Sequence, residues 1–382
     1  MKRLIYFTSS SYGGLADYAH EQANALVQLG VDVEMLTTAQ YRQRADCRYK
    51  IRAVLVDSTH RTRSGLAQRV SWVSCILKNV RTLNREILQG EYTAVLMGAY
   101  SEYLAPLWSR QLRCRARDGV VFGAIIHDPV RDFVVGPYWW HRRSVAAAYS
   151  FLREAFVHEE IQLDTVRSMP SLRTTVIPHG PYSFPEPTES RKQIRKKLAI
   201  PDDAFVALSF GHIRDGKNLD LVIQAMADVP EVYLVVAGKE QSSAQKPISY
   251  YQELAKKYSV ASRCQWIHKH VPATEVGNLF IAADLVLLTY SRDFRSASGV
   301  LNAAISFRKP CVASSGGGNL CSVVERYNLG WFVEPDSLPA LKAGIATAVQ
   351  EMIDPRWEAY ESENSWGRNA QLVNEKMFGS IL

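Results

Sequence analysis

Short apolar runs alternate with segments of helical periodicity along the whole chain. Apolar runs of strand length in the first half lie at residues 3–8, 31–37, 94–100, 120–127 and 155–159. Residues 15–29 instead repeat apolar positions near helical spacing and stop at Gly30, a residue type common at helix C-termini. Strands that alternate with helices predict parallel sheets with covering helices, which is an α/β fold.

The same alternation resumes in the second half after a change in composition. Residues 182–201 contain three prolines and a charged helical stretch, which predicts a linker and the start of a second domain. Strands are then predicted at residues 204–213, 232–238, 285–290 and 310–314, and helices at residues 218–226, 273–283 and 301–307. Residues 357–378 are predicted to form a pair of terminal helices.

Length and composition agree with a two-domain globular protein. The chain has 382 residues, of which 47% are hydrophobic and 22% are charged. Its six cysteines are scattered without a CxxC motif, which favours a reducing compartment and argues against structural zinc or a disulfide framework. The first residues predict a β-strand, with a signal peptide as the alternative, and no apolar run has the length of a membrane span.

The net charge of +7 is unevenly distributed along the chain. Residues 1–180 contain 23 Lys and Arg against 16 Asp and Glu, whereas residues 181–382 contain 22 of each. Nucleic acid, an anionic membrane surface or a phosphorylated substrate could each explain an excess of positive charge in the first half. An unselected surface excess is the remaining alternative.

Residues 294–318 combine a small-residue loop, a helical pattern, a short strand and three glycines. Ser296, Ser298 and Gly299 stand where the helix begins. A helix N-terminus offers free N–H groups and the positive end of a dipole, so this loop predicts a site for an anion such as a diphosphate. The three glycines predict a flexible backbone beside it.

Eight stretches in order give the chain a family resemblance. They are SSSYGGLADYAHEQANAL, AIIHDP, VIPHG, FGHIRDGKNLDLVIQAM, LVVAGKE, ATEVGNLFIAADLVLLTY, SGVLNAAISFRKPCVAS and VVERYNLGWFVEP. With these stretches the chain resembles the retaining glycosyltransferases of family four over residues 1 to about 336. The resemblance implies a GT-B fold, in which two Rossmann-like domains face each other across a cleft.

The resemblance also implies a domain division and a reaction. We expect residues 1–180 to bind the acceptor, residues 181–362 to bind a nucleotide sugar, and residues 363–382 to form a helix that crosses back to the first domain. Members of this family transfer a sugar from a nucleotide sugar to an acceptor, usually without a metal. No DxD motif occurs in the chain, so we expect no metal and no other cofactor.

Without a metal, fixed cations must neutralise the departing nucleoside diphosphate. Arg214 and Lys217 follow Gly211 on a loop after a predicted strand, and the family carries an Arg and a Lys in this loop. We therefore expect Arg214 and Lys217 to act on the diphosphate and Gly211 to lie close to it. The alternative is a solvated loop with two ordinary surface cations.

Two acidic residues that the family usually carries are missing. Counting back from Pro310, their positions hold Arg295 and Ala303. The first acid normally lies close to the transferred sugar and the second holds the ribose. Asn302, one residue before the second position, is a candidate ribose contact, and Ser296 and Ser298 are candidate replacements for the acidic contacts.

The first domain supplies further candidates from matching positions. Tyr12, Gly13 and Gly14 lie between the first strand and the first helix, where glycine permits close approach of the backbone to the donor and Tyr12 is placed to meet the acceptor. His127 ends a strand and is expected to face the transferred sugar, with Asp128 orienting the imidazole or contacting the acceptor. The alternative for the two glycines is an ordinary turn. The alternative for His127 and Asp128 is a pair that only caps a turn at the end of the strand.

Residues 61–87 predict an amphipathic helix. Leu66, Val70, Val73, Leu77 and Val80 recur at helical spacing and form the expected core stripe. Arg63, Lys78, Arg81 and Arg85 fall beside that stripe, while Trp72 and Ile76 project from its other side. Such a surface could dock on anionic lipid or a polyprenyl diphosphate, and an ordinary helix with a charged rim is the alternative.

Together these features predict a retaining glycosyltransferase that acts on a saccharide or lipid-linked acceptor in bacterial surface polysaccharide or glycolipid assembly. A non-catalytic nucleotide-sugar-binding or scaffold protein of the same fold is the alternative, because both acidic residues are missing. A nucleic-acid-binding protein is disfavoured, since no recognised nucleic-acid module occurs. We expect a cytoplasmic location, with peripheral attachment to the inner face of the cytoplasmic membrane as an alternative.

Overall fold

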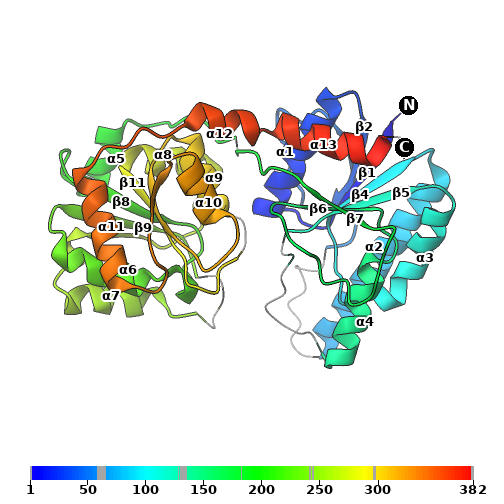
Figure 1. Cartoon of the computed structure of the whole chain (residues 1–382), viewed down its shortest axis with the longest axis horizontal. Helices are drawn as coiled ribbons and strands as arrows, with labels where there is room; N and C mark the ends of the chain where they lie inside the picture. The colour runs from blue at the N-terminus through cyan, green and yellow to red at the C-terminus, as the bar shows by residue number, and fades with distance from the viewer. Residues whose placement is uncertain are drawn as a thin grey trace. The chain divides into compact units, whose positions relative to one another are not determined.

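The computed structural model of the chain describes residues 2–57, 66–127, 129, 136–181, 183–240, 242, 245–295 and 298–379, with the side chains of residues 66–69 excepted. The chain divides into two compact units, Met1–Gly180 with Asn364–Leu382, and Pro181–Glu363 (Figure 1). The first boundary directly precedes the proline-rich segment, and the chain returns to the first unit after Glu363, one residue beyond the predicted position.

The first unit is built on a parallel sheet of seven strands in the order β3-β2-β1-β4-β5-β6-β7. Its strands are β1 (Arg3–Thr8), β2 (Asp32–Thr38), β3 (Lys50–Leu55), β4 (Ala94–Ala99), β5 (Val121–Ile125), β6 (Glu154–Val157) and β7 (Arg173–Val176). Its helices are α1 (Gly14–Gln28), α2 (Leu66–Gln89), α3 (Ala105–Arg117), α4 (Tyr138–Tyr149) and α13 (Trp366–Phe378).

The residues of β1 show how this sheet is covered on both faces. Leu4 and Tyr6 belong to one hydrophobic cluster with residues of α1 and α13. Ile5 and Phe7 belong to the other, with residues of α2, α3 and α4. Because successive side chains of a strand point to opposite faces, a wholly apolar strand requires two covering layers of helices.

The second unit repeats this plan with six parallel strands in the order β10-β9-β8-β11-β12-β13 (Figure 1). Its strands are β8 (Phe205–Phe210), β9 (Val232–Ala237), β10 (Cys264–Ile267), β11 (Leu285–Thr289), β12 (Cys311–Ser314) and β13 (Gly330–Phe332). Its helices are α5 (Arg191–Lys197), α6 (Leu219–Ala225), α7 (Ile248–Lys257), α8 (Ala273–Ala282), α9 (Gly299–Ser306), α10 (Leu320–Arg326), α11 (Leu338–Gln350) and α12 (Trp357–Glu363), with 3₁₀ turns η1 (Asp215–Lys217), η2 (Met226–Asp228) and η3 (Ala261–Arg263).

One expectation about α2 needs correction. Val70 was expected in the core stripe, but its side chain is 62% exposed. Val80 is buried as predicted, and Cys75, Leu83 and Ile87 are buried with it, while Leu66 and Arg63 lie outside the described side chains. The core-facing stripe therefore begins further along the helix than its periodicity predicts. In the part of the chain that the structure describes, no helix combines the length and apolar character needed to span a membrane.

Candidate functional site

The carboxyl ends of β8, β11 and β12 meet at one edge of the second sheet. The strand order runs outward from β8 in one direction and from β11 in the other, so it reverses between these two neighbours. Open α/β sheets bind their ligands outside the carboxyl ends of the strands at such a point. The loops that begin at Gly211, Tyr290 and Ser315 follow these strands and form a candidate donor site.

Lys217 is fixed at this edge through both its side chain and its backbone. Its Nζ donates a hydrogen bond to the carbonyl of Phe210, the last residue of β8. Its own carbonyl accepts from Thr289 Oγ1 at 2.7 Å. Burial, and then the nearby Arg214 guanidinium, lower the pKa of Lys217 from 10.5 to about 7. A bound anion would favour the charged form of this amine.

Gly211 connects Lys217 with the start of α9. Its φ of 90° lies in the region that favours glycine. A Cβ at this position would lie 3.4 Å from Lys217 Nζ and 3.6 Å from Val300 Cγ2. The amine and the first turn of α9 therefore flank the same stretch of backbone, as the predicted diphosphate site requires.

Arg214 is placed over two stacked aromatic rings. Its Cζ lies 5.6 Å from the ring centroid of Tyr290 and 5.2 Å from that of Phe294. The two rings stack with centroids 3.9 Å apart and planes at 16°. Within the described residues Arg214 forms no ion pair, so cation–π contacts orient a guanidinium whose charge is not neutralised by a carboxylate.

The start of α9 is capped by Ser298. Its Oγ accepts from the Leu301 amide at 3.1 Å and lies 2.8 Å from the hydroxyl of Tyr290. Ser298 is 7% exposed, and its hydroxyl caps the helix. A ligand would therefore meet the amides of Gly299 and Val300 at the helix start. The other predicted serine, Ser296, lies outside the described residues.

Asn302 points into the unit. It is 4% exposed, and its Oδ1 accepts a hydrogen bond from Tyr360 of α12 at 3.0 Å. A ribose contact would require Asn302 to give up this buried bond, so the structure favours a structural role over the predicted one. Ala303 is 2% exposed in the hydrophobic cluster of this face, where a carboxylate would be costly to bury.

The three glycines after β12 pack closely, which corrects the expectation of a flexible backbone. A Cβ on Gly316 would lie 1.6 Å from the Arg292 carbonyl oxygen, and one on Gly318 would lie 2.7 Å from that of Arg295. A Cβ on Gly317 would lie 2.9 Å from Arg295 Nη1. Glycine is therefore needed because the loop before α9 lies against this backbone.

In the first unit, the loop between β1 and α1 contains the predicted Tyr12, Gly13 and Gly14. Gly13 has a φ of 74°, and its carbonyl accepts from the amides of Ala16 and Asp17 at 2.9 and 3.0 Å. No atom lies within 4 Å of a Cβ built on Gly13, so the backbone conformation rather than crowding requires glycine there. Tyr12 is 71% exposed and is open to a ligand.

His127 belongs to a group of rings around the buried Tyr18. Its ring centroid lies 4.8 Å from that of Tyr18 and 5.6 Å from that of His158. His179 lies 5.3 Å from His158 and 5.1 Å from Tyr18. Burial, and then the neighbouring histidines, lower the pKa of His127 well below 6.5.

His127 is therefore neutral near pH 7. A neutral imidazole can donate a hydrogen bond to a sugar hydroxyl or accept one from it. Its predicted neighbour Asp128 lies outside the described residues. His158 and His179 are also held neutral, because burial lowers the pKa of His158 to about 4 and that of His179 to about 3.

A small pocket at the carboxyl edge of the first sheet was not found from the sequence. It has a volume of about 90 Å³ and lies between the ends of β1 and β4 and the inner side of α2. Trp72 and Ile76 form part of its wall. Trp108 Nε1 and Ser101 Oγ are buried without a hydrogen-bond partner among the described residues, which suits a ligand that supplies an acceptor. The one signal for this pocket in the sequence was the projection of Trp72 and Ile76 from one side of the predicted helix.

The predicted site residues thus fall into two groups. Gly211, Arg214, Lys217, Ser298 and Gly299 come together in the second unit, while Tyr12, Gly13, Gly14 and His127 lie in loops at the carboxyl edge of the first sheet. Their contacts with a ligand stay predictions.

Part of the chain matches a known family and a curated relative in sequence. Residues 190–373 match the sequence model of the family described as Glycosyl transferases group 1. A D-inositol 3-phosphate glycosyltransferase of Mycobacterium leprae (strain Br4923) is 30% identical over 164 residues, which cover 40% of this chain and 37% of that protein. The match therefore spans little more than a third of the length of that curated relative.

Solved structures share the fold over nearly the whole chain. Sucrose-phosphate synthase from Thermosynechococcus elongatus aligns with a TM-score of 0.69 at 16% identity, covering 98% of each chain. The HepE protein of Anabaena, solved in complex with UDP and glucose, aligns with a TM-score of 0.63 at 15% identity, covering 99% of this chain and 96% of that one. The chain therefore has a GT-B fold of two Rossmann-like units, and residues 190–373 are the segment that matches the glycosyl transferases group 1 model.

Proposed function

We propose that the protein is a retaining glycosyltransferase that moves a sugar from a nucleoside-diphosphate sugar to an acceptor hydroxyl. The observation that carries this proposal is the convergence of Lys217, Arg214 and the start of α9 at the point where the strand order of the second sheet reverses. The HepE structure with bound UDP and glucose supports a nucleotide sugar as the donor.

The second unit would bind the diphosphate and neutralise the charge that develops as it departs. Lys217 and Arg214 supply two cations, and the amides of Gly299 and Val300 supply hydrogen bonds with a favourable helix dipole. These groups would do the work of a metal ion, so the proposed chemistry is metal-independent. A phosphate oxygen of the leaving group would take the proton of the acceptor hydroxyl on the face from which it departs.

The first unit would bind the acceptor. Its pocket at the carboxyl edge of the sheet offers the Trp72 ring and the unpaired donors of Trp108 and Ser101, a combination that suits a sugar ring or its substituent. His127 would hydrogen-bond a hydroxyl of the transferred sugar. We place the reaction in the assembly of bacterial surface polysaccharide or glycolipid, with a saccharide or lipid-linked acceptor.

The first test is binding followed by transfer. The full chain is titrated calorimetrically with UDP, GDP and ADP, and the tightest binder is then offered as its glucose, galactose, mannose and N-acetylglucosamine conjugates. The expected result is saturable binding of one nucleoside diphosphate and slow release of free sugar from its conjugate in the absence of an acceptor. NMR of the transfer product would show the same anomeric configuration as the donor.

Arg295 and Ala303, which stand where the family usually has acids, keep a non-catalytic binding protein as the second candidate. Binding of a nucleotide sugar without release or transfer of the sugar, over a range of acceptors, would favour that candidate. Failure to bind any of the three nucleoside diphosphates would contradict both.

A further inference from the structure

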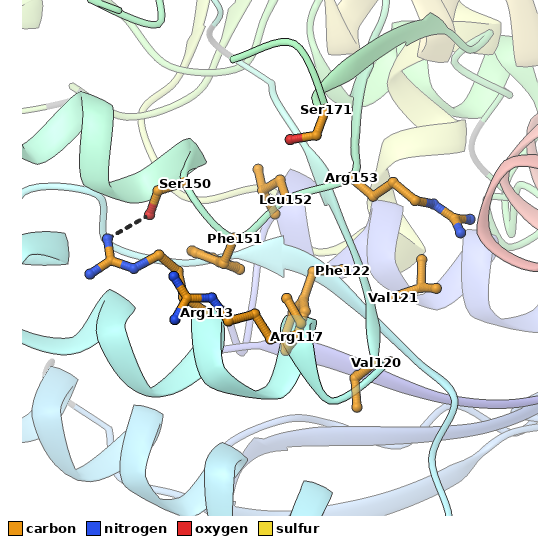
Figure 2. A pocket seen from close by; sticks show the side chains of 12 residues that line it. Arg113, Arg117, Val120, Val121, Phe122, Ser150, Phe151, Leu152, Arg153 and Ser171 are labelled. Carbon is orange, nitrogen blue, oxygen red and sulfur yellow. Dashed lines mark hydrogen bonds between the residues drawn. The ribbon is translucent and has the colours of Figure 1, made fainter. Parts of the chain in front are cut away.

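A second pocket lies at the opposite edge of the first sheet from His127 (Figure 2). It is bounded by the C-terminal turn of α3, the end of α4 and the residues at the starts of β5 and β6, and its volume is about 430 Å³. His127 follows β5 at its carboxyl end, whereas Val120 and Val121, which line this pocket, stand at its beginning. The pocket therefore belongs to none of the loops discussed above.

Among the described residues, the pocket is lined by three arginines and by no acidic residue. Arg113 Nη1 donates to Ser150 Oγ at 3.1 Å, and Arg153 Nη2 donates to the carbonyl of Met377 at 3.0 Å. Among the described residues, neither of these two arginines nor Arg117 forms an ion pair. Arg113 and Arg117 thus bring positive charge to the pocket that no carboxylate of the described residues pairs.

The positions of Arg113 and Arg117 make this charge unfavourable without a ligand. They stand four residues apart on α3, a spacing at which like charges repel each other on one face of a helix. Figure 2 shows both side chains extended in the same direction, toward Ser150, while the Arg153 guanidinium points away. The dipole of the helix C-terminus favours both Arg115 and Arg117, which lie in the last turn, and Asp118 lies 3.0 Å from Arg115.

The floor of the pocket is apolar. Phe122, Phe151 and Leu152 line it and are 1%, 4% and 4% exposed, so the hydrophobic core of the unit forms its base. A ligand that fills the pocket would therefore meet two guanidinium groups at one side and aromatic carbon below. Pockets of several hundred Å³ with an apolar lining and a few polar groups are typical of small-molecule sites.

We propose that this pocket binds a phosphate monoester carried on an apolar group, with the phosphate between Arg113 and Arg117 and the apolar group against Phe122 and Phe151. Two guanidinium groups match the double negative charge of a phosphate monoester and form paired hydrogen bonds with its oxygens. The ester is either a soluble metabolite or the headgroup of a lipid. The proposal does not rest on the donor site, because all its residues lie in the first unit.

The test uses phenyl phosphate, phenol and inorganic phosphate as probes of the full-length Lys217→Ala variant. That background weakens binding of phosphate at the proposed donor site, so that titration calorimetry reports the pocket. Phenyl phosphate is expected to bind saturably and at least tenfold more tightly than inorganic phosphate, and phenol is expected not to bind. Equal affinity for phenyl phosphate and inorganic phosphate would overturn the apolar part of the proposal, and no saturable binding would overturn it entirely.

A matched pair of variants then locates the site. Arg113→Gln with Arg117→Gln removes two charges from the pocket, and Arg110→Gln with Arg115→Gln removes the same charge from the same helix outside it. The first pair is expected to weaken binding of phenyl phosphate at least tenfold and the second less than twofold. Equal losses would show that the helix charge alone, and not the pocket, attracts the ester.

A third variant keeps all the charges and fills the space. Ala116 lines the pocket, so Ala116→Leu is expected to weaken binding of phenyl phosphate more than that of inorganic phosphate. Unchanged affinity for phenyl phosphate in this variant would place the ligand elsewhere. Vesicles of equal charge, made with phosphatidic acid or with phosphatidylglycerol, distinguish the source of the ester. Tighter binding to phosphatidic acid that the Arg113/Arg117 variant loses assigns a lipid, and equal binding to both vesicles assigns a soluble ester.

Discussion

Lys217 lies between the last carbonyl of β8 and the backbone of Gly211, with a pKa of about 7. An amine whose pKa lies this close to pH 7 becomes protonated readily when an anion binds, because the anion stabilises the protonated form. Arg214 differs in that its guanidinium is held over the rings of Tyr290 and Phe294. The two cations of the candidate site therefore have different properties.

We expect Lys217→Ala to weaken binding of the preferred nucleoside diphosphate and to slow sugar transfer at least tenfold, equivalent to about 1.4 kcal/mol of transition-state free energy. The reason is that no other described amine is fixed against both β8 and the start of α9. Titration calorimetry and initial-rate measurements check it. A transfer rate within twofold of the parent would remove Lys217 from the site.

The pH dependence of binding should separate lysine from arginine at this position. In the free protein the cation is present below pH 7 and is lost as the pH rises through that value, so affinity for the diphosphate should fall above pH 7 by up to about tenfold per pH unit. Lys217→Arg should lack this fall, because guanidinium stays protonated. Identical affinity profiles for both proteins between pH 7 and 9 would contradict the assignment.

His127 should affect turnover more than nucleotide affinity. It is neutral and lies among Tyr18 and His158 in the first unit, whereas the candidate diphosphate site lies in the second. His127→Ala is expected to lower the transfer rate at least tenfold and to change the dissociation constant of the diphosphate less than twofold. His127→Gln, which can still hydrogen-bond, should recover part of the rate, and normal transfer by the alanine variant would argue against the role.

At the scale of elements, close backbone packing connects the loops of the donor site. The Cβ of Gly316→Ala would lie 1.6 Å from the carbonyl oxygen of Arg292, so the loop before α9 has to move. We expect this variant to unfold at a lower temperature and to bind the diphosphate at least tenfold more weakly.

Gly367→Ala is the matched control, because only Ser365 Oγ, at 3.8 Å, lies within 4 Å of its Cβ and alanine favours the helix. Its unfolding temperature should be unchanged or higher. Equal behaviour of the two variants would show that the three-glycine loop is not tightly packed.

Buried strands were predictable because their pattern is simple. β1 was placed at its exact bounds, and β8, β9, β11 and β12 were found within two or three residues, since each is a nearly continuous run of apolar residues. The strands missed, β3, β7, β10 and β13, are the edge strands of the two sheets. β7 has no buried residue and β3 has one, so tertiary pairing rather than apolar pattern makes them strands.

The candidate site was predictable where one short segment contains it. Arg214 and Lys217 lie within one loop, so their spacing after a strand was visible in the sequence. The stack of Tyr290 on Phe294 beneath Arg214, and the pocket beside Trp72, join residues from different loops and helices. Such contacts depend on the packing of elements, which spacing along the chain does not encode.

The exposed face of α2 is the element most suited to an anionic membrane. Lys78, Arg81 and Arg85 are exposed, and Trp72 is 36% exposed near the other end of the helix. We expect the protein to co-sediment with vesicles that contain anionic lipid and to be released as salt rises, since exposed charges are screened over roughly 8 Å at physiological ionic strength.

Replacing Lys78, Arg81 and Arg85 with glutamine should abolish this binding. Replacing Lys192, Lys196 and Lys197, which carry the same charge on or beside α5 of the second unit, should leave it intact. Equal binding to neutral and anionic vesicles would exclude an electrostatic attachment.

At the scale of the whole molecule, the last helix of the chain stabilises the first unit. α13 covers the sheet face of Leu4 and Tyr6, beside α1 (Figure 1). Asn369 is fully buried on this helix. Its Nδ2 donates to Tyr18 at 2.9 Å and to the Pro178 carbonyl at 2.7 Å, and its Oδ1 accepts from Gln22 at 2.7 Å. Residues from three distant parts of the sequence therefore meet at one side chain.

This connection predicts that the two units respond separately to different changes. Asn369→Ala removes three buried hydrogen bonds, with Tyr18, Gln22 and Pro178, and opens a cavity, which should destabilise the first unit by about 3 kcal/mol or more. Asn374→Ala on the same helix loses only an exposed contact with Lys2 and should cost less than about 0.5 kcal/mol.

Saturating nucleoside diphosphate, at about a hundred times its dissociation constant, should stabilise the second unit by about 2.7 kcal/mol in the parent and in both variants. Hydrogen exchange resolved by peptide measures both units at once: protection should fall in β1 and β5 of the Asn369 variant and rise around β8 and α9 with ligand. A ligand that protects β1 in the Asn369 variant as strongly as α9 would show instead that the units unfold as one.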